Sequence, residues 1–353
     1  MLDQYMMASI DDPTTWLAYG KVDPELAEIL GQGGKPQFDK DNRIEGIPSV
    51  RATWTPLYKQ FAATALLQAQ PDVHGGEIFV PCTDGHLARC MVYKPSNLPR
   101  NGSPIIVLFH GGGWCFGCPE MDALNCIKAV QKYGAVALSV DYRLAPECPF
   151  PAAVNDSWDV LQWVATNAVQ LGGNPSLGFI IGGTSAGGNI SAALSHLARD
   201  KGMSPRITGV WLNIPALLSH DAVPEQYRHL YLSREQNKNA PILPKSAMDM
   251  YEEAYKPTLS SELWNPFNWS SGHMDLPPHY FQICGMDVLR DEGLLYERVL
   301  RKEYGAITKV DIYSGLPHVY WANFPTHSRS KDYAEDTNKG LGWLLNMSGS
   351  EKP

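Results

Sequence analysis

The most restrictive feature of this 353-residue chain is a glycine-flanked serine between a predicted strand and a predicted helix. The apolar run 179–182 (sequence FIIG) indicates a buried strand, and the stretch 183–187 (sequence GTSAG) follows it directly. A Gly-x-Ser-x-Gly turn is so tight that larger neighbours of the serine would collide. A helix beginning at Ala186 would point its free N–H groups at the serine oxygen. Ser185 is therefore the candidate nucleophile.

A second glycine run follows an upstream strand. The apolar segment 104–109 predicts a buried strand that leads into the stretch 110–114 (sequence HGGGW). Three successive glycines are costly to order, so they indicate a backbone that approaches another group closely. We expect the amides of Gly112, Gly113 and Ala186 to form an oxyanion hole. The alternative is a flexible turn in which backbone carbonyls satisfy His110.

A serine nucleophile needs a base, and the base needs a carboxylate partner. In folds that carry the nucleophile on a Gly-x-Ser-x-Gly turn between a strand and a helix, the chain order is Ser, then Asp or Glu, then His. His318 follows the β-rich run 309–313 and a turn, while Asp287 follows the buried run 279–284 and a turn. Both side chains would then lie at the carboxyl ends of strands. We therefore predict His318 as the base and Asp287 as its partner.

Three nearby polar residues have other expected places. Asp291 and Glu292 are predicted in the first turn of a helix over 291–304, where the helix dipole favours acidic side chains. His327 is a rival base, but it stands in a polar stretch beyond the turn. We expect His327 to be solvated.

Five ordered motifs resemble the hormone-sensitive-lipase-like carboxylesterase branch of the α/β-hydrolase superfamily. They are HGGGW at 110–114, DYRLAPE at 141–147, GTSAGG at 183–188, DVLRDEG at 287–293 and GLPH at 315–318. The resemblance runs from about residue 80 to the end, and it implies that Ser185, Asp287 and His318 form a catalytic triad. Thr184 stands where that family more often has Asp or Glu, and Val319 where Gly is common. Both departures alter the wall of the site.

Alternation of predicted strands and helices indicates a mostly parallel, eight-stranded sheet covered on both faces. From residue 105 onward the strands alternate with helical patterns over 121–133, 152–168, 189–199 and 294–304. The first two strands flank a short turn and should form a hairpin at the sheet edge. The predicted strands are 77–82, 87–94, 105–109, 135–140, 178–182, 209–214, 279–284 and 308–313.

Two regions fall outside this alternation and predict a helical cap over the site. Residues 1–70 would form its N-terminal part and residues 216–272 an insertion, whereas residues 71–215 and 273–353 would form the catalytic core. In the resembling family both regions build a cap. We expect substrate contacts from the oxyanion loop and the cap, with packing of the cap against the sheet as the alternative. The candidates are Trp114, Phe116, Tyr227, Tyr231, Met248, Tyr251, Trp264 and Val319.

Composition favours a compact enzyme and argues against several other classes. The formal net charge of −8 argues against binding to nucleic acid or an anionic membrane surface. No apolar run approaches the roughly 20 residues that span a bilayer. The acidic segment 1–7 lacks the features of a secretion signal, so a cytoplasmic location is expected. Cys115 and Cys118 have metal-like spacing without a second ligand pair, and we expect no metal.

We therefore expect a serine esterase that cleaves carboxylic esters of small to medium apolar molecules through an acyl-enzyme intermediate. No cofactor is implied. An amidase, a polyketide-releasing thioesterase, or a dehydratase or cyclase would be compatible with the same fold and triad. A small-molecule receptor on this scaffold is disfavoured because all three triad members are present. The natural acyl group stays open, as does the oligomeric state, with a homodimer as one option.

Overall fold

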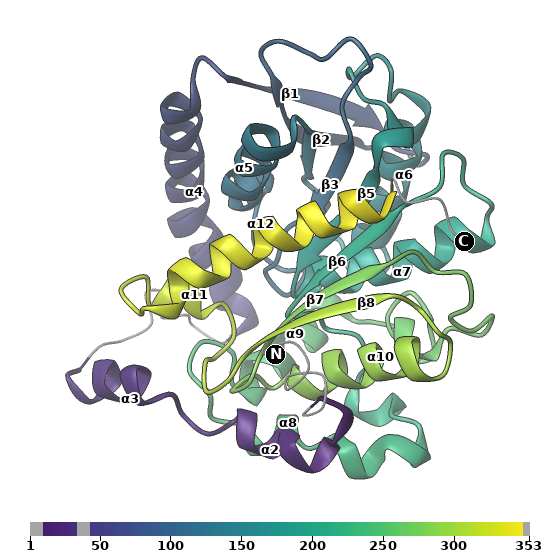
Figure 1. The fold of residues 1–353 in the computed structure, drawn as a ribbon. Helices are drawn as coiled ribbons and strands as arrows, with labels where there is room; N and C mark the ends of the chain where they lie inside the picture. The colour runs from purple at the N-terminus through teal and green to yellow at the C-terminus, as the bar shows by residue number, and fades with distance from the viewer. Residues whose placement is uncertain (1–9, 34–42, 349–353) are drawn as a thin grey trace.

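The expected eight-stranded sheet is present in the computed structural model, which describes residues 10–33 and 43–348 (Figure 1). The strand order is β1-β2-β4-β3-β5-β6-β7-β8. β1 and β4 run antiparallel to β2, and every other neighbouring pair is parallel. The segment 1–7 lies outside the described residues. The strands are β1 (Val73–Pro81), β2 (Leu87–Pro95), β3 (Ile105–Phe109), β4 (Val136–Val140), β5 (Phe179–Thr184), β6 (Gly209–Asn213), β7 (His279–Cys284) and β8 (Thr308–Tyr313).

The predicted edge hairpin is confirmed, although its first strand is longer than expected. β1 begins at Val73 rather than at residue 77, and Val73 pairs with Pro95 of β2. The extra residues include Gly75 and Gly76, which have low strand propensity and hid this part of the strand from the pattern. Pairing with β2 over its whole length outweighs that propensity.

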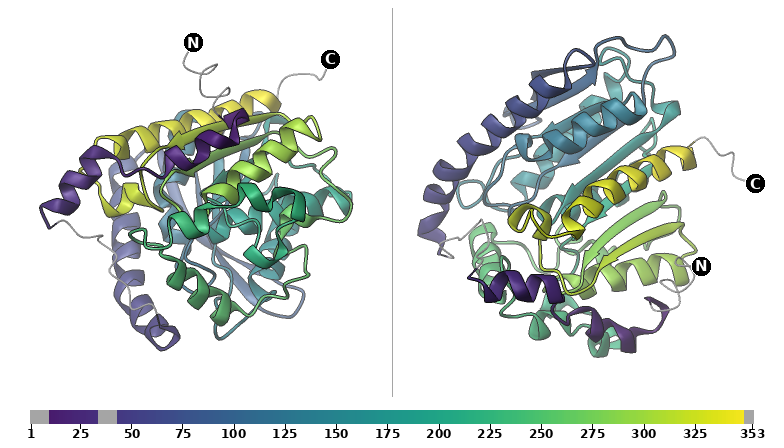
Figure 2. Two further views of the ribbon diagram at one scale, coloured as in Figure 1. Left: turned by 90° about the horizontal axis from the view of Figure 1, so that it is seen from below. Right: turned by 60° about the vertical axis from the view of Figure 1, so that its left-hand side comes forward.

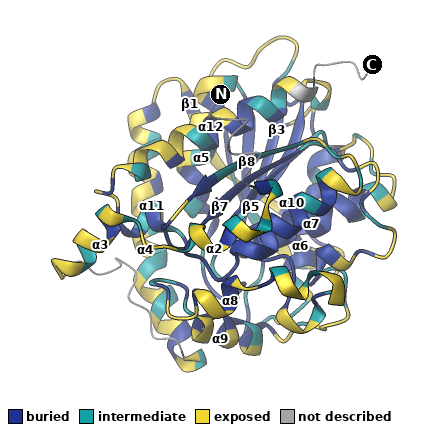
Figure 3. Ribbon diagram, turned by 60° about the horizontal axis from the view of Figure 1, so that its bottom comes forward, coloured by how far each residue is buried: buried dark blue, intermediate teal, exposed yellow. Residues whose placement is uncertain are grey.

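Helices cover both faces of the sheet (Figure 2). In β3, Ile106 and Leu108 pack in one apolar cluster, whereas Ile105 and Val107 pack in the other, as the two-residue period of a strand requires. Figure 3 shows buried strands beneath helices with exposed outer surfaces. The first cluster is covered by α4 (Ile47–Ala69), α5 (Ala123–Tyr133) and α12 (Arg329–Ser348), and the second by α6 (Ala152–Thr166), α7 (Ala186–Asp200) and α10 (Arg290–Lys302).

The two regions outside the alternation contact the loops that follow β7 and β8. From the N-terminal region, Asp23 N–H donates to Gly315 O at 3.1 Å. From the insertion, Asn237 Nδ2 donates to Asp287 O at 2.7 Å. That the two regions act together as a cap stays a prediction. Besides α4, which belongs to the N-terminal region and packs on the sheet, their helices and turns are η1 (Pro13–Thr15), α2 (Trp16–Tyr19), α3 (Pro24–Gly31), η2 (Ile44–Gly46), η5 (His220–Ala222), η6 (Glu225–Leu230), α8 (Ser233–Gln236), α9 (Lys245–Tyr255) and η7 (Pro266–Asn268).

Asp291 and Glu292 lie in the first turn of α10, as predicted, and they also anchor the insertion. Glu292 Oε2 accepts the N–H groups of Leu217 and Leu218 at 2.7 and 3.0 Å, and Glu292 Oε1 accepts Tyr231 O–H at 2.7 Å. Asp291 Oδ2 accepts two further insertion amides. Burial raises the pKa of Glu292 to about 7, although these hydrogen bonds favour its charged form.

Replacement of Glu292 by Gln should flatten the pH dependence of stability. The folded-state pKa of Glu292 lies above its ordinary value of 4.5, so its stabilising contribution is present below that value and lost as pH rises through about 7. Between about pH 5 and about pH 8, we expect wild type to lose about 2 kcal/mol of unfolding free energy relative to Glu292→Gln. Urea unfolding at both pH values measures this difference. The exposed control Glu253→Gln should follow wild type, and a Glu292→Gln profile parallel to wild type would contradict the prediction.

Candidate active site

Ser185 lies in a strained turn between β5 and α7. Its φ of 57° and ψ of −114° are unusual for a residue with a side chain. A Cβ on Gly183 would lie 2.3 Å from Phe109 O, and a Cβ on Gly187 only 1.8 Å from the same oxygen. Only glycine permits this approach of the turn and α7 to the end of β3.

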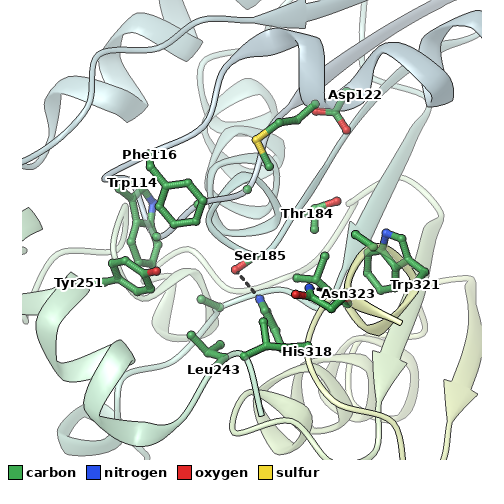
Figure 4. A pocket seen from close by; sticks show the side chains of 18 of the residues that line it. Trp114, Phe116, Asp122, Thr184, Ser185, Leu243, Tyr251, His318, Trp321 and Asn323 are labelled. Carbon is green, nitrogen blue, oxygen red and sulfur yellow. Dashed lines mark hydrogen bonds between the residues drawn. The ribbon is translucent and has the colours of Figure 1, made fainter. Parts of the chain in front are cut away.

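A continuous hydrogen-bonded chain joins Ser185, His318 and Asp287 (Figure 4). Ser185 Oγ lies 3.0 Å from His318 Nε2, and His318 Nδ1 lies 2.6 Å from Asp287 Oδ2. All three side chains are buried. Asp287 Oδ1 accepts Leu289 N–H at 3.0 Å, so both carboxylate oxygens are held. The structure therefore brings together the three residues that the sequence singled out.

The glycine loop after β3 lies beside Ser185. Gly112 O accepts the N–H groups of Cys115 and Phe116 at 3.1 and 3.0 Å, which closes the loop into a tight turn. Gly112 and Gly113 have φ values of 122° and 59° and line the same cavity as Ser185. Within the described residues, the amides of Gly112, Gly113 and Ala186 donate to no protein acceptor. An oxyanion hole would need such unpaired donors.

His110 holds the shape of this loop. Its Nδ1 lies 2.8 Å from Gly111 O, and its ring stacks on Tyr142 with centroids 4.2 Å apart. The Tyr142 hydroxyl donates to His110 O at 2.7 Å. Burial lowers the pKa of His110, which favours the neutral ring. The expected contact of His110 with a backbone carbonyl is present, but in a loop built by many other bonds.

Arg51 of α4 donates hydrogen bonds to the same loop and to the segment beside it. Its Nε donates to Cys115 O at 2.7 Å, and its Nη2 donates to Ala145 O. Ala145 N–H in turn donates to Trp114 O at 2.8 Å. Arg51 also pairs with Glu147 at 2.8 Å. One guanidinium from the N-terminal region thus joins the residue after the HGGGW motif to the DYRLAPE motif.

Ser185 and His318 open onto a cavity of about 150 Å³. Figure 4 shows Trp114, Phe116 and Tyr251 on one side of Ser185, and Thr184, Asn323 and Trp321 on the other. The wall of the cavity contains both polar and apolar side chains. They come from the N-terminal region, the insertion and the core. The lining residues are Tyr58, Gly111, Gly112, Gly113, Trp114, Phe116, Met121, Asp122, Asn125, Thr184, Ser185, Ala216, Ile242, Leu243, Met248, Tyr251, His318, Val319, Trp321, Ala322, Asn323 and Tyr333.

Three of the aromatic residues expected in the pocket do not line this cavity. Tyr227 O–H bonds to Glu303, and its ring packs edge-on against Phe267, so it faces away. The Tyr231 hydroxyl donates to Glu292 Oε1 and lies 3.0 Å from Leu218 O. Trp264 packs behind Trp114 with ring centroids 4.8 Å apart. These placements match the alternative of structural packing.

The expectation that His327 is solvated is wrong. Its side chain is 1% exposed, and its Nε2 lies 3.1 Å from Asp23 Oδ1. Its Nδ1 accepts Arg329 N–H at 3.2 Å, so Nε2 carries the proton that is donated to Asp23. Glu25 stands nearby, and the three side chains have the spacing of a metal site. Their oxygens and nitrogens already hold α3 against the start of α12, which accounts for the cluster.

The two departures from the family pattern both lie in the cavity wall. Val319 has a φ of 52°, a conformation that glycine adopts at little cost and a β-branched residue only with strain. Thr184 Oγ1 accepts Asn213 Nδ2–H at 2.9 Å. The sequence reading missed Asp122, Asn125, Trp321 and Asn323, which contribute further to the wall. Trp321 and Asn323 follow His318 so closely that their proximity to the site was a usable signal.

An α/β sheet with a Ser-His-Asp chain beside a glycine loop defines a protein of the hydrolase class. A family model described as an alpha/beta hydrolase fold matches residues 106–322, and the chain belongs to that family. This is the hormone-sensitive-lipase-like family that the motifs resemble.

Similar proteins match from about three quarters to nearly all of the chain. An AB hydrolase superfamily protein of Schizosaccharomyces pombe is 41% identical over 328 residues, which is 93% of this chain and 95% of that protein. A versiconal hemiacetal acetate esterase of Dothistroma septosporum is 35% identical over 72% of this chain and 78% of its own. The crystal structure of vibralactone cyclase superposes with a TM-score of 0.85 at 29% identity, covering 94% of this chain and 97% of that one. The chain is a carboxylesterase-like hydrolase of this family.

Across residues 10–33 and 43–348, no helix combines the length and the apolar character needed to cross a membrane.

Replacement of Arg51 by Met should impair turnover without touching the Ser-His-Asp chain. We expect kcat to fall about 10-fold, because hydrogen bonds from a charged group to two loop carbonyls are lost. Glu147→Gln is the matched control, since it removes only the partly exposed ion pair, worth about 0–1 kcal/mol. Steady-state kinetics and thermal unfolding of both variants test this. A wild-type kcat for Arg51→Met would show that Arg51 does not support the glycine loop.

Proposed function

We propose that this protein hydrolyses carboxylic esters of small to medium apolar molecules, with Ser185 as nucleophile. The observation that carries the proposal is the buried Ser185–His318–Asp287 chain at the wall of a cavity. Such an arrangement activates a hydroxyl that is otherwise a weak nucleophile. The likeness to a versiconal hemiacetal acetate esterase supports an ester as the substrate class.

The first half of the reaction forms an acyl-enzyme. His318 Nε2 takes the Ser185 proton as Oγ attacks the carbonyl carbon, and Asp287 stabilises the imidazolium that results. The amides of Gly112, Gly113 and Ala186 donate to the oxyanion of the tetrahedral intermediate. His318 then gives its proton to the leaving alcohol oxygen, and the C–O bond to that alcohol breaks.

The second half frees the enzyme. A water molecule loses a proton to His318 Nε2 as its oxygen attacks the acyl carbon, and the bond to Ser185 Oγ breaks as Oγ regains a proton. The carboxylic acid leaves. All proton transfers use one ring nitrogen, which explains why Asp287 must fix the ring from the other side.

Trp114, Phe116 and Tyr251 form the apolar side of the pocket. The ring of Trp114 stacks on Tyr255 with centroids 4.9 Å apart and also packs against Trp264. These contacts restrict its movement. Tyr251 also packs so closely over Gly113 that an added Cβ would lie 2.4 Å from its ring. We infer that this rigid aromatic wall binds the acyl chain and sets its maximum length.

A second candidate is cyclisation, favoured by the likeness to vibralactone cyclase over 94% of the chain. In that case a hydroxyl of the acyl group, rather than water, would attack the acyl-enzyme carbon and release a lactone. Product analysis by mass spectrometry with a hydroxyacyl ester separates the two. A lactone indicates cyclisation, whereas the free hydroxy acid indicates hydrolysis.

Ser185→Ala and His318→Ala should each lower kcat by about 10⁴-fold or more, and Asp287→Asn somewhat less. All three serve one proton transfer, so each loss disables the same step. Hydrolysis of p-nitrophenyl butyrate measures the effect, with circular dichroism to verify folding. Retention of more than about a tenth of the activity by Ser185→Ala would refute the nucleophile assignment.

The acyl-length profile should peak at or below about six carbons. Each methylene that fits the pocket contributes about 0.8 kcal/mol, but a carbon that displaces packed side chains costs about 1–3 kcal/mol. Trp114→Ala should move the maximum of kcat/KM to longer chains. A graded series of p-nitrophenyl esters tests this. A wild-type rate that keeps rising through long-chain esters would contradict it and indicate an open lipid groove.

A further inference from the structure

Asp122 contributes a buried carboxyl to the cavity wall without serving the local role that its position suggests. It occupies the N-cap position of α5, where an Asp side chain ordinarily accepts N–H groups of the first helical turn. Here the side chain makes no such bond. The residue is 3% exposed, and it lines the same cavity as Ser185 and His318.

The Asp122 carboxyl is poorly satisfied by the protein. Within the described residues, Oδ1 accepts only a long bond of 3.4 Å from Asn125 Nδ2, and Oδ2 has no hydrogen-bond partner. Burial raises the pKa of Asp122 to about 6. An unpartnered buried carboxyl is costly, so this oxygen has unused capacity to accept a hydrogen bond.

No cation of the described chain compensates Asp122. The residues that line the cavity include neither Lys nor Arg. The nearby acid Glu120 is different, since Arg89 donates to both of its oxygens at 2.8 and 2.9 Å. Glu120 therefore forms a structural ion pair, whereas the neighbouring Asp122 is an unpaired acceptor.

Asp122 lies on the polar side of the pocket. Figure 4 shows it on the same side of Ser185 as Thr184, Asn323 and Trp321, with Trp114, Phe116 and Tyr251 on the other side. Asn125 also lines the cavity, and its side-chain amide donates the long bond to Asp122 Oδ1. A bound ester with its carbonyl at Ser185 would then meet aromatic rings at one end and a carboxyl group at the other.

We propose that Asp122 is a specificity-determining residue that accepts a hydrogen bond from a hydroxyl or protonated amine of the substrate. The preferred ester is thus bipartite: an apolar portion faces Trp114 and Phe116, and a donor-bearing portion faces Asp122. This inference rests on the proposed function in so far as it concerns an ester. Recognition of the donor itself requires no turnover.

Matched substrates test the proposal. Butyrate esters of short α,ω-diols and of the corresponding amino alcohols are compared with n-alkyl butyrates of equal length, and hydroxyacyl ethyl esters with alkanoate ethyl esters. The readout is the ratio of kcat/KM for the donor-bearing ester to that for its methyl isostere. We expect a wild-type ratio of about 10 to 100 in at least one series, as for a hydrogen bond to a buried carboxyl group.

Variants at Asp122 separate recognition from general damage. Asp122→Leu should bring the ratio to about 1, and Asp122→Asn should keep the preference for a hydroxyl but lose that for an ammonium group. Asp159→Leu is the control, because Asp159 accepts hydrogen bonds from Thr83 outside the cavity. It should keep the wild-type ratio. A ratio is insensitive to an overall loss of active protein.

Equilibrium binding to Ser185→Ala tests recognition by Asp122 separately from ester hydrolysis. If the donor-bearing esters bind more tightly than their isosteres and Asp122→Leu abolishes that difference, the subsite stands even where no ester is turned over. Equal dissociation constants for both members of every pair, or a preference that survives Asp122→Leu, would overturn the subsite while leaving ester hydrolysis intact.

Discussion

The close approach of α7 to the end of β3 is the constraint on which the site depends. Phe109 O lies where a Cβ of Gly183 or Gly187 would have to stand, so the main chain of the turn reaches the strand directly. That contact places the first amide of α7 beside the glycine loop that leaves β3. It also forces Ser185 into a conformation that costs about 1–3 kcal/mol, a strain sustained by the surrounding sheet.

The loops around Ser185 are held mostly by segments remote in the sequence. Arg51 supports the glycine loop, Asn237 supports the main chain of Asp287, and Tyr19 O accepts the N–H of Gly315 just before His318. The first and third bonds come from the N-terminal region and the second from the insertion, and each ends on backbone rather than on a reacting side chain. The reacting groups are therefore positioned through their loops, while Ser185 Oγ, both His318 ring nitrogens and Asp287 Oδ2 bond to one another.

The sequence could predict the sheet and the Ser-His-Asp chain because both follow from strand ends. Ser185, Asp287 and His318 each come directly after a recognisable strand, and parallel strands bring those ends to one edge. It could not predict which way Tyr227 faces, since an irregular insertion has no period from which to read a face. His327 was misjudged because its partner, Asp23, lies 304 positions away. Asp122 was missed because the helical pattern over 121–133 included it, and only the structure shows that it stands at the N-cap without making the cap bond.

The long sequence separation of the contacts around His318 has a consequence for how the protein acquires its site. Ser185 and His318 are 133 positions apart, and the latch from Asp23 to His327 spans almost the whole chain. Loop-closure entropy rises, although slowly, with sequence separation, so these contacts cost more to close than those between neighbouring strands. The central strands have nearer partners and can assemble first. We therefore expect the sheet to assemble before the catalytic loops align, so that secondary structure is regained before activity when the unfolded protein refolds.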